Sequence, residues 1–433
     1  MLRTSVAVAA GRATRVITRL RGGGSALPGL VAERVDPKFL SHALRGLPRG
    51  IVVVTGTNGK TTTTKMLAAV LRAHGLRVFS NPTGSNFTRG VISAMLGEVP
   101  VSGRLDADVA VLELDEAHAL KFADAIRPTH ALLLNVARDQ LDRFAEIDYT
   151  ADLLARLGER TTTAVVLNID DTFVSRAAER LPDALAVRYF GVHPSIAARL
   201  PELQEADVRF EGDFAPPEPT DEDGLLKPHG ERRFEVRFGS EVVGPLELQQ
   251  RGLAAMINAT AAASMARAVL GTDFDPARTA QSLAAVRPPF GRGEVIDVGG
   301  QPLELVLVKN PAGFTVALAT YGGTPVATMV AINDDYADGR DVSWLYDVSF
   351  ESLRERGVAV TSGVRAYDMA LRLSYDDVAV AHVIPELDRA LEAFLAGPAQ
   401  EPRRIFCTYT AMMALRRELA GRFGLAAIGE ETG

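Results

Sequence analysis

The chain of 433 residues contains only one cysteine, Cys407. A single cysteine excludes an intramolecular disulfide framework, a C-x-x-C redox pair and a zinc site built from several cysteines. Chains with so little cysteine are typical of reducing compartments. We therefore expect a cytoplasmic protein whose one thiol is buried in an apolar strand and chemically inert.

An excess of basic charge and a long hydrophobic run are also absent. The 47 lysines and arginines are outnumbered by 54 acidic residues, which gives a net charge of −7. This balance argues against broad binding to nucleic acid, and no nucleic-acid partner is expected. No stretch approaches the roughly 20 apolar residues that span a bilayer. A hydrophobic content of 47% with 23% charged residues is instead typical of a globular protein of two or three domains.

Residues 1–30 are rich in arginine and small side chains and contain no acidic residue. Their longest apolar run, 6–10, is too short for the core of a secretory signal. The apolar spacing as far as Leu20 predicts an amphipathic helix that is interrupted at Gly11 and ends before the glycines at 22–24. The sequence leaves two interpretations of its arginines open, contact with an anionic membrane surface at the inner leaflet or a solvated helix face.

Buried-strand and helix patterns alternate along most of the chain, which predicts open parallel α/β sheets with right-handed crossovers. In the first half, the strand candidates are residues 51–54, 109–112, 131–134 and 164–167. A second α/β unit follows a proline- and glycine-rich hinge at 287–293, with strand candidates at 303–308, 326–332, 358–361, 378–382 and 405–408.

These patterns divide the chain into three parts. We predict an N-terminal helical segment (1–45) packed on a central domain (46–293), followed by a C-terminal domain (294–433). Within the central domain, residues 193–233 are expected to form a variable loop. Its proline- and acid-rich stretch, 216–224, is expected to be exposed.

A glycine-rich loop follows the first buried strand and opens a helix. It comprises Thr55, Gly56, Thr57, Asn58, Gly59, Lys60, Thr61 and Thr62. Glycines let backbone N–H groups converge on an anion, and the helix N-terminus adds the positive end of its dipole. In this interpretation Lys60 contacts the transferred phosphate and the Thr61 hydroxyl holds Mg²⁺. The loop is a shortened phosphate loop, because Val54 stands where the general pattern has glycine. An ordinary strand–helix turn with a surface lysine is the disfavoured alternative.

The octapeptide TGTNGKTT closely resembles the ATP-binding loop of the Mur ligase superfamily, which includes folylpolyglutamate synthases. The resemblance implies a Mur-ligase-like central ATPase domain with a parallel sheet and a smaller Rossmann-like C-terminal domain. It also implies a chemistry in which a carboxylate and ATP form an acyl phosphate, from which an amine displaces the phosphate.

Later positions resemble the same superfamily. Glu113 ends a strand where these enzymes bind Mg²⁺, although Asp115 and Glu116 follow closely and stay open as alternatives. By resemblance, the nucleotide pocket includes Asn135, Asn168, Asp171 and Asn258, and Arg292 contacts the γ-phosphate or the acyl phosphate. Residues 135–143 resemble the motif N-x-x-x-D-H-L-D-R, with Gln140 in the position of a histidine that contacts a second metal. A carbamylated lysine is missing as well, so one Mg²⁺ is predicted.

The C-terminal part narrows the resemblance. Lys309, Asn310 and Pro311 stand where amino-acid-adding ligases carry an acidic D-x-A-H-N-P segment. Residues 333–347, 362–373 and 408–412 strongly resemble the MurT family, the Mur-ligase-like subunits of lipid II isoglutaminyl synthase. This resemblance covers the chain from residue 27 onward. It implies ATP-dependent amidation of the D-glutamate α-carboxylate in the lipid II stem peptide, with ammonia from a glutaminase partner of the GatD type.

The MurT resemblance also implies roles for single residues. An aspartate of the D-V-S-W-x-x-D motif supports the catalytic histidine of the partner, with Asp341 as first candidate and Asp347 as second. Trp344 is either an interface anchor or a core residue. Many members carry a four-cysteine zinc ribbon in the central domain, but residues 193–233 contain no cysteine and only two histidines, His193 and His229. We therefore predict no zinc.

Two other functions are alternatives to this one. An amino-acid-adding ligase of the folylpolyglutamate synthase kind shares the phosphate loop, but is expected to have the carbamylated lysine and the acidic C-terminal segment. A regulatory or scaffold protein with a vestigial nucleotide site is disfavoured by the joint retention of Lys60, Thr61, Glu113, Asn135 and Arg292.

Overall fold

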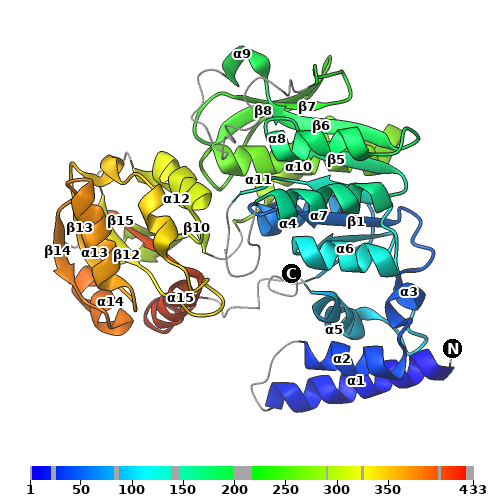
Figure 1. The fold of residues 1–433 in the computed structure, drawn as a ribbon, viewed down its shortest axis with the longest axis horizontal. Helices are drawn as coiled ribbons and strands as arrows, with labels where there is room; N and C mark the ends of the chain where they lie inside the picture. Colours follow the sequence, from blue (N-terminus) through cyan, green and yellow to red (C-terminus); the bar gives the residue numbers. More distant parts are fainter. Residues whose placement is uncertain are drawn as a thin grey trace.

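The computed structural model describes residues 2–20, 26–81, 87–137, 147–197, 217–288, 291–322, 326–397 and 401–425. Two α/β units lie beside each other, and three N-terminal helices cover the far side of the larger unit (Figure 1). The expectation of two α/β units built mainly from parallel strands is confirmed.

The larger sheet has nine strands within the described residues, in the order β2-β3-β1-β4-β5-β6-β7-β8-β9. Neighbours from β2 to β7 run parallel, whereas β8 is antiparallel to both β7 and β9. The strands are β1 Ile51–Thr55, β2 Val78–Ser80, β3 Val109–Glu113, β4 His130–Leu133, β5 Ala164–Asn168, β6 Ala186–Val192, β7 Gly224–Pro228, β8 Arg233–Phe238 and β9 Glu241–Glu247.

Helices cover both faces of this sheet. Alternate residues of β1 enter different cores: Val53 packs in the cluster that includes α5, α6 and α7, and Val52 packs in the cluster that includes α4 and α10. Because β1 to β7 run parallel, their carboxyl ends lie at the same edge of the sheet, which is where α/β proteins bind ligands. The helices are α4 Lys60–Ala73, α5 Thr88–Glu98, α6 Glu116–Ala125, α7 Ile147–Arg160, α8 Thr172–Arg176, α9 Pro194–Ala197, α10 Leu253–Leu270 and α11 Pro276–Ala285.

The expectation that no stretch is apolar enough to span a bilayer is wrong for the core helix α10. The segment Leu253–Asp273 is long and apolar enough to cross a membrane, with a mean hydropathy of 1.4. Its most apolar window is, however, 67% buried inside the protein, and α10 packs against α4 and β5 to β7. Its apolar length is therefore explained by its place in the core.

The N-terminal helices are α1 Leu2–Leu20, α2 Leu27–Val35 and α3 Phe39–Leu44. The predicted interruption at Gly11 is wrong, because α1 runs through it without a break. A Cβ atom at Gly11 would lie 2.5 Å from Leu96 Cδ1 on α5. The glycine thus allows α1 to approach α5 closely, which offsets its unfavourable helix propensity.

The prediction of a loop over residues 193–233 is wrong in part. Residues 198–216 lie outside the described part of the chain, but 224–228 form β7, inside the sheet. Asp223, expected in an exposed loop, is buried and accepts hydrogen bonds from the N–H groups of Tyr189 and Thr220. Its carboxylate therefore fixes the start of β7 against β6.

The smaller sheet has six strands in the described residues, in the order β10-β11-β15-β12-β13-β14, parallel except for the β10–β11 pair. Its first strand begins at Arg292, two residues before the predicted domain start at 294, so Arg292 lies in a strand and not in the hinge. Cys407 is buried in β15, and burial raises the pKa of its thiol. The strands are β10 Arg292–Val298, β11 Gln301–Leu307, β12 Ala327–Ala331, β13 Val358–Ser362, β14 Val380–Val383 and β15 Arg403–Cys407.

Helices flank this sheet too. They are α12 Pro311–Ala317, α13 Ala366–Tyr375, α14 Leu387–Leu395 and α15 Tyr409–Phe423, with the π-helical turn η4 Leu318–Gly322 and the 3₁₀ turns η5 Ser343–Asp347 and η6 Glu351–Leu353. In Figure 1, α12 lies on the side of this unit that faces the larger one.

Candidate active site

The glycine-rich loop connects β1 to α4 at the carboxyl edge of the larger sheet. Gly56 and Gly59 have φ values of +131° and +87°, which favour glycine. Both are also tightly enclosed, since a Cβ at Gly59 would lie 2.3 Å from Asn258 Oδ1 and one at Gly56 would lie 2.9 Å from the Asn135 nitrogen. The loop conformation therefore requires both glycines.

Asn135, just beyond β4, holds this loop in place. Its Oδ1 accepts from the N–H of Asn58 (2.8 Å), its Nδ2 donates to the Asn58 carbonyl (3.0 Å), and its own carbonyl accepts from the N–H of Thr57 (2.9 Å). Three hydrogen bonds from one residue fix the loop before any ligand binds.

Lys60 is the first residue of α4 and is buried. Its Nζ donates to the carbonyl of Gly56 (2.6 Å) and lies 3.3 Å from Asp115 and 3.5 Å from Glu116. The ammonium is thus held beside the loop by two carboxylates, in a position to bind an anion that enters the loop.

Thr61, Glu113 and Arg292 meet next to Lys60. The Thr61 hydroxyl donates to Glu113 Oε1 (2.9 Å), and Arg292 Nη2 donates to Thr61 Oγ1 (3.4 Å). Burial raises the pKa of Glu113, although Arg292, Thr61 and Lys60 oppose that shift. Burial also lowers the pKa of Arg292, and the charge of Glu113 opposes it. The buried Glu113 carboxylate and the half-buried Arg292 guanidinium therefore stabilise each other's charge.

This oxygen pair fits Mg²⁺. The ion prefers hard oxygen ligands, and in phosphoryl-transfer sites it takes one or two carboxylates together with substrate phosphates. A buried Glu113 carboxylate beside the Thr61 hydroxyl offers that donor set. Among the described residues, there is no group of three or more His, Cys, Asp or Glu side chains that could hold a metal without such a substrate.

The geometry separates the three acids that the sequence left open. Glu113 faces the Thr61 hydroxyl, whereas Asp115 and Glu116 face Lys60. Asn81, which sequence reasoning missed, fixes the main chain of Glu113: its Nδ2 donates to the Glu113 carbonyl and its Oδ1 accepts from the Glu113 N–H, both at 2.9 Å. The geometry favours Glu113 as the metal ligand, and that role stays a prediction.

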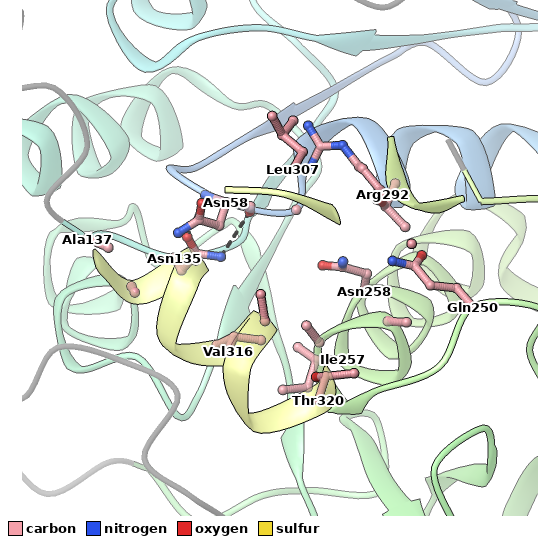
Figure 2. Close-up of a pocket in the computed structure, with 18 of the residues that line it drawn as sticks. Asn58, Asn135, Ala137, Gln250, Ile257, Asn258, Arg292, Leu307, Val316 and Thr320 are labelled. Carbon is pink, nitrogen blue, oxygen red and sulfur yellow. Dashed lines mark hydrogen bonds between the residues drawn. The ribbon is translucent and has the colours of Figure 1, made fainter. Parts of the chain in front are cut away.

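A cavity of about 190 Å³ lies against this loop, between the two α/β units. Figure 2 shows side chains of the loop and α10 on one side of it and those of α12 and η4, such as Val316 and Thr320, on another. Of the residues predicted to bind nucleotide or phosphate, the following line it: Asn58, Gly59, Thr62, Asn135, Asn168, Asp171, Asn258 and Arg292. The other predicted loop residues do not line it: Thr55, which lies buried at the end of β1, and Gly56, Thr57, Lys60 and Thr61.

Asn168 and Asp171 also support the cavity wall. Asn168 Nδ2 donates to the carbonyl of Leu134 (2.9 Å), and Asp171 accepts from the N–H groups of Val136 (2.8 Å) and Val174 (3.0 Å). Complete burial raises the pKa of Asp171 to about 6 despite these hydrogen bonds. Both side chains therefore hold the end of β4, from which Asn135 reaches the loop.

Several lining residues were not predicted. Gln250 and Arg251 precede α10, Lys309 follows β11, and Tyr321 lies in η4. Arg251 donates to Glu304 (2.8 Å) and its guanidinium stacks 4.7 Å from the centre of the Tyr321 ring. The sequence singled out Lys309 only for the acidic residues missing there, and no local motif marks Gln250, Arg251 or Tyr321, because only the docking of the two units brings them together.

Asn310 provides a direct polar link between the units. Its side chain is fully buried and caps α12, with Oδ1 accepting from the Gly313 N–H (2.7 Å). Its Nδ2 donates to Asn58 Oδ1 in the glycine-rich loop (3.1 Å). The sequence analysis noted that this segment lacks the acidic residues of amino-acid-adding ligases, but it did not predict the hydrogen bond from Asn310 to Asn58.

Asp341 and Asp347 do not line the cavity. Asp341 lies two residues before η5 and Asp347 is its last residue, and both are exposed. Asp341 accepts a hydrogen bond from the Ser343 N–H (2.8 Å). Hydrogen bonds from Ser343 lower the pKa of Asp341. Trp344 between them is buried and its ring lies 6.2 Å from that of Phe314 on α12, so it is a core residue and not an exposed anchor. Gln140 and the rest of its motif from 138 onward lie outside the described residues.

Comparison with known proteins agrees with this architecture. The family model "Mur ligase middle domain" matches residues 54–222, and "MurT ligase C-terminal" matches residues 307–412. The chain is 31% identical over 460 residues to a protein of Streptococcus pneumoniae named lipid II isoglutaminyl synthase (glutamine-hydrolyzing) subunit MurT. The alignment covers 97% of this chain and 98% of that relative.

Solved structures give the same fold. A pseudomurein peptide ligase type C from Methanothermus fervidus superposes with a TM-score of 0.67 at 19% identity, over 87% of this chain and 79% of the other. MurF ligase from Thermotoga maritima in complex with ADP gives a TM-score of 0.62 at 16% identity, over 91% and 85%. The predicted fold class is therefore confirmed, and the 31% identity over nearly the whole chain shows that it belongs to the MurT family of Mur-ligase-like proteins.

Proposed function

We propose that this chain is the ligase subunit of a lipid II isoglutaminyl synthase. It amidates the α-carboxylate of D-glutamate in the lipid II stem peptide, in peptidoglycan synthesis, with ATP and with ammonia from a GatD-like glutaminase subunit. The observation that carries the proposal is the meeting of Thr61, Glu113 and Arg292 next to Lys60, with Arg292 also lining the cavity between the two units, in a chain that matches a MurT protein almost end to end.

The first step consumes ATP. A carboxylate oxygen of the substrate attacks the γ-phosphorus of ATP, and the bond from that phosphorus to the oxygen that bridges to the β-phosphate breaks. ADP departs as the leaving group, and the substrate becomes an acyl phosphate. The loop N–H groups and Lys60 bind the phosphates, and Arg292 places a half-buried positive charge beside Thr61, where negative charge develops. A Mg²⁺ ion held by Thr61 and Glu113 would neutralise further charge on the phosphate oxygens.

The second step forms the amide. The ammonia nitrogen attacks the acyl carbon, the bond from that carbon to the phosphate oxygen breaks, and phosphate and a proton leave. Lys309 and Asn310 occupy the position of an acidic segment in amino-acid-adding ligases, and Asn310 is buried in a link to the loop. A nucleophile as small as ammonia needs no such acidic side chain to bind an amino group.

The ammonia comes from a second protein. Glutaminases of this kind use a thiolate nucleophile, and the only cysteine here is buried with a raised thiol pKa. Asp341 is exposed and its pKa is lowered, so an ionised carboxylate is available to orient a histidine of the partner. Asp347 is the second candidate for that role.

Mass spectrometry of the product tests the proposal. The chain and its glutaminase partner are incubated with lipid II, ATP, Mg²⁺ and glutamine labelled with ¹⁵N in the side-chain amide. We expect one ¹⁵N amide on the D-glutamate α-carboxyl, and ADP formed in equal amount. The chain alone should accept ammonium but release no ammonia from glutamine.

A parallel incubation offers amino acids in place of glutamine. Addition of an amino acid, with no amidation by ammonium, would favour the alternative of an amino-acid-adding ligase. Glutamine hydrolysis by the pure chain would contradict the two-subunit arrangement.

A further inference from the structure

Helix α1 presents an apolar stripe to the outside of the molecule. Leu2, Val6, Val16 and Ile17 are 86%, 52%, 60% and 52% exposed. Ala9 and Ala13 are exposed between them. Spacings of four, three, four, three and one place all six on one side of a helix. Scattered apolar residues are ordinary on protein surfaces, but an unbroken stripe over four turns indicates a binding surface.

The opposite side of α1 is firmly packed. Ala7 and Val8 are buried in the main core of the larger unit, and Gly11 lies against Leu96 of α5. The Thr4 hydroxyl donates to Asp36 beyond the end of α2 (2.9 Å). The exposed stripe is therefore a fixed feature of the fold and not the face of a detached helix. In Figure 1, α1 lies at the edge of the molecule that is farthest from β7 and β8.

The charge on α1 itself has one sign, although the elements packed against it contribute acids such as Glu98, which interacts with Arg15. Residues 1–32 contain five arginines and no acidic residue, in a chain of net charge −7. Arg3 donates to the Val35 carbonyl (2.7 Å), and Arg12 donates to the carbonyls of Leu96 and Val99. At 100° per residue, positions 3 and 12 lie about a quarter turn to either side of the stripe. Apolar side chains flanked by arginines are the pattern of helices that lie in the plane of a membrane interface.

We propose that α1 docks this protein on an anionic bilayer surface, with the stripe among the acyl chains and the flanking arginines at the phosphate level. A bilayer is favoured over a protein partner because the stripe has no polar group to pair with a partner and the charged side chains of α1 itself are all basic. The proposed function gives such docking a purpose, since lipid II is anchored in a membrane. Docking itself does not depend on that function.

Vesicle flotation tests the docking directly. The full-length protein is mixed with vesicles of phosphatidylcholine alone or with phosphatidylglycerol added, at low and high salt. We expect binding to the anionic vesicles that falls with salt and is weak on neutral ones. The double variant Val16→Glu/Ile17→Glu should bind on the order of tenfold less, because two charges would have to enter the apolar layer. Val295→Glu, a change at an exposed valine of the smaller sheet, is the matched control and should bind like the wild type.

Other occupants of the stripe give different results. Wild-type protein that ignores anionic vesicles, or a double variant that binds them as well as the control, would overturn the proposal. So would a wild-type dimer that the double variant converts to a monomer, because the stripe would then bind a second copy. Both variants should melt at the wild-type temperature, since the changed side chains are exposed.

A second readout connects docking to the proposed function. Amidation of lipid II embedded in anionic vesicles should be slower for the double variant, whereas amidation of a water-soluble stem peptide should be unchanged. If neither substrate is amidated by any form but flotation behaves as expected, the proposed function fails and the docking surface stands.

Discussion

The two sides of the interdomain cavity differ in how they are built. The side from the larger unit is polar and fixed by its own hydrogen bonds, with Asn135, Asn168 and Asp171 holding the loop and the end of β4. The side from the smaller unit is mostly small or apolar, through Ala312, Val316 and their neighbours. From the smaller unit, Asn310 donates a hydrogen bond to Asn58 and Arg292 donates one to Thr61, and both acceptors belong to the loop. Phosphate chemistry is thus preorganised on one side, and the other side completes the site only when the units are docked.

The largest loss of activity is expected from a change at Lys60, on the preorganised side of the cavity. Lys60→Ala removes the ammonium beside the loop and should lower ATP-dependent amidation on the order of a thousandfold, because charge stabilisation in the transition state is lost. Lys65→Ala, one turn along the same helix, should leave the rate near the wild-type value. The rate of product formation by mass spectrometry measures both. Substantial activity in Lys60→Ala would remove the phosphate-loop role.

Asp341→Asn addresses the surface of the smaller unit away from the cavity. Replacing the carboxylate that orients a partner histidine should lower glutamine hydrolysis in the complex on the order of a hundredfold. Amidation with free ammonium should be spared, because Asp341 does not line the cavity. The comparison with Asp347→Asn decides between the two candidates. If Asp341→Asn and the wild type hydrolyse glutamine at the same rate, Asp341 does not orient the partner histidine, and either Asp347 does so or neither aspartate does.

Glu113→Gln separates the metal site from the lysine site. The amide keeps a hydrogen-bond acceptor for Thr61 but loses the charge, so activity should fall by roughly ten- to a hundredfold and require more Mg²⁺. Asp115→Asn and Glu116→Gln should act through Lys60 and leave the Mg²⁺ dependence unchanged. The same Mg²⁺ dependence in Glu113→Gln and wild type would argue that another group binds the metal.

The pH dependence of the wild type gives a further check on Glu113. Its pKa is raised by burial, so the carboxylate takes up a proton at a higher pH than an exposed glutamate as the solution is acidified. Mg²⁺-dependent activity should therefore decline with falling pH before ordinary carboxylates titrate, and added Mg²⁺ should shift that decline to lower pH.

The same contrast explains what could be predicted from the sequence. Residues 55–62 and Glu113 follow directly from buried strands, so a local pattern locates them. The strands β1, β3, β4, β5 and β11 to β15 were found in the same way, whereas β2, β6, β7, β9 and β10 were not predicted. Gln250, Arg251 and Tyr321 reach the cavity only through the docking of two units, which no local pattern encodes. Gly11 was misjudged because helix propensity ignores the neighbouring Leu96. The hydrogen bond of Asn310 to Asn58 spans 252 positions and has no sequence signal.

The smallest expected effect tests that long-range link. Asn310→Ser keeps an oxygen that can cap α12 but is too short to reach Asn58, so one buried hydrogen bond is lost while the helix keeps its cap. A buried hydrogen bond contributes about 1 kcal/mol, which corresponds to roughly a fivefold rise in KM for ATP at little cost in melting temperature. In an Asn58→Ala background, Asn310→Ser should have no further effect, because its partner is already gone. Additive losses in the double variant would instead mean that the two asparagines act independently and that the smaller unit does not position the loop through this contact.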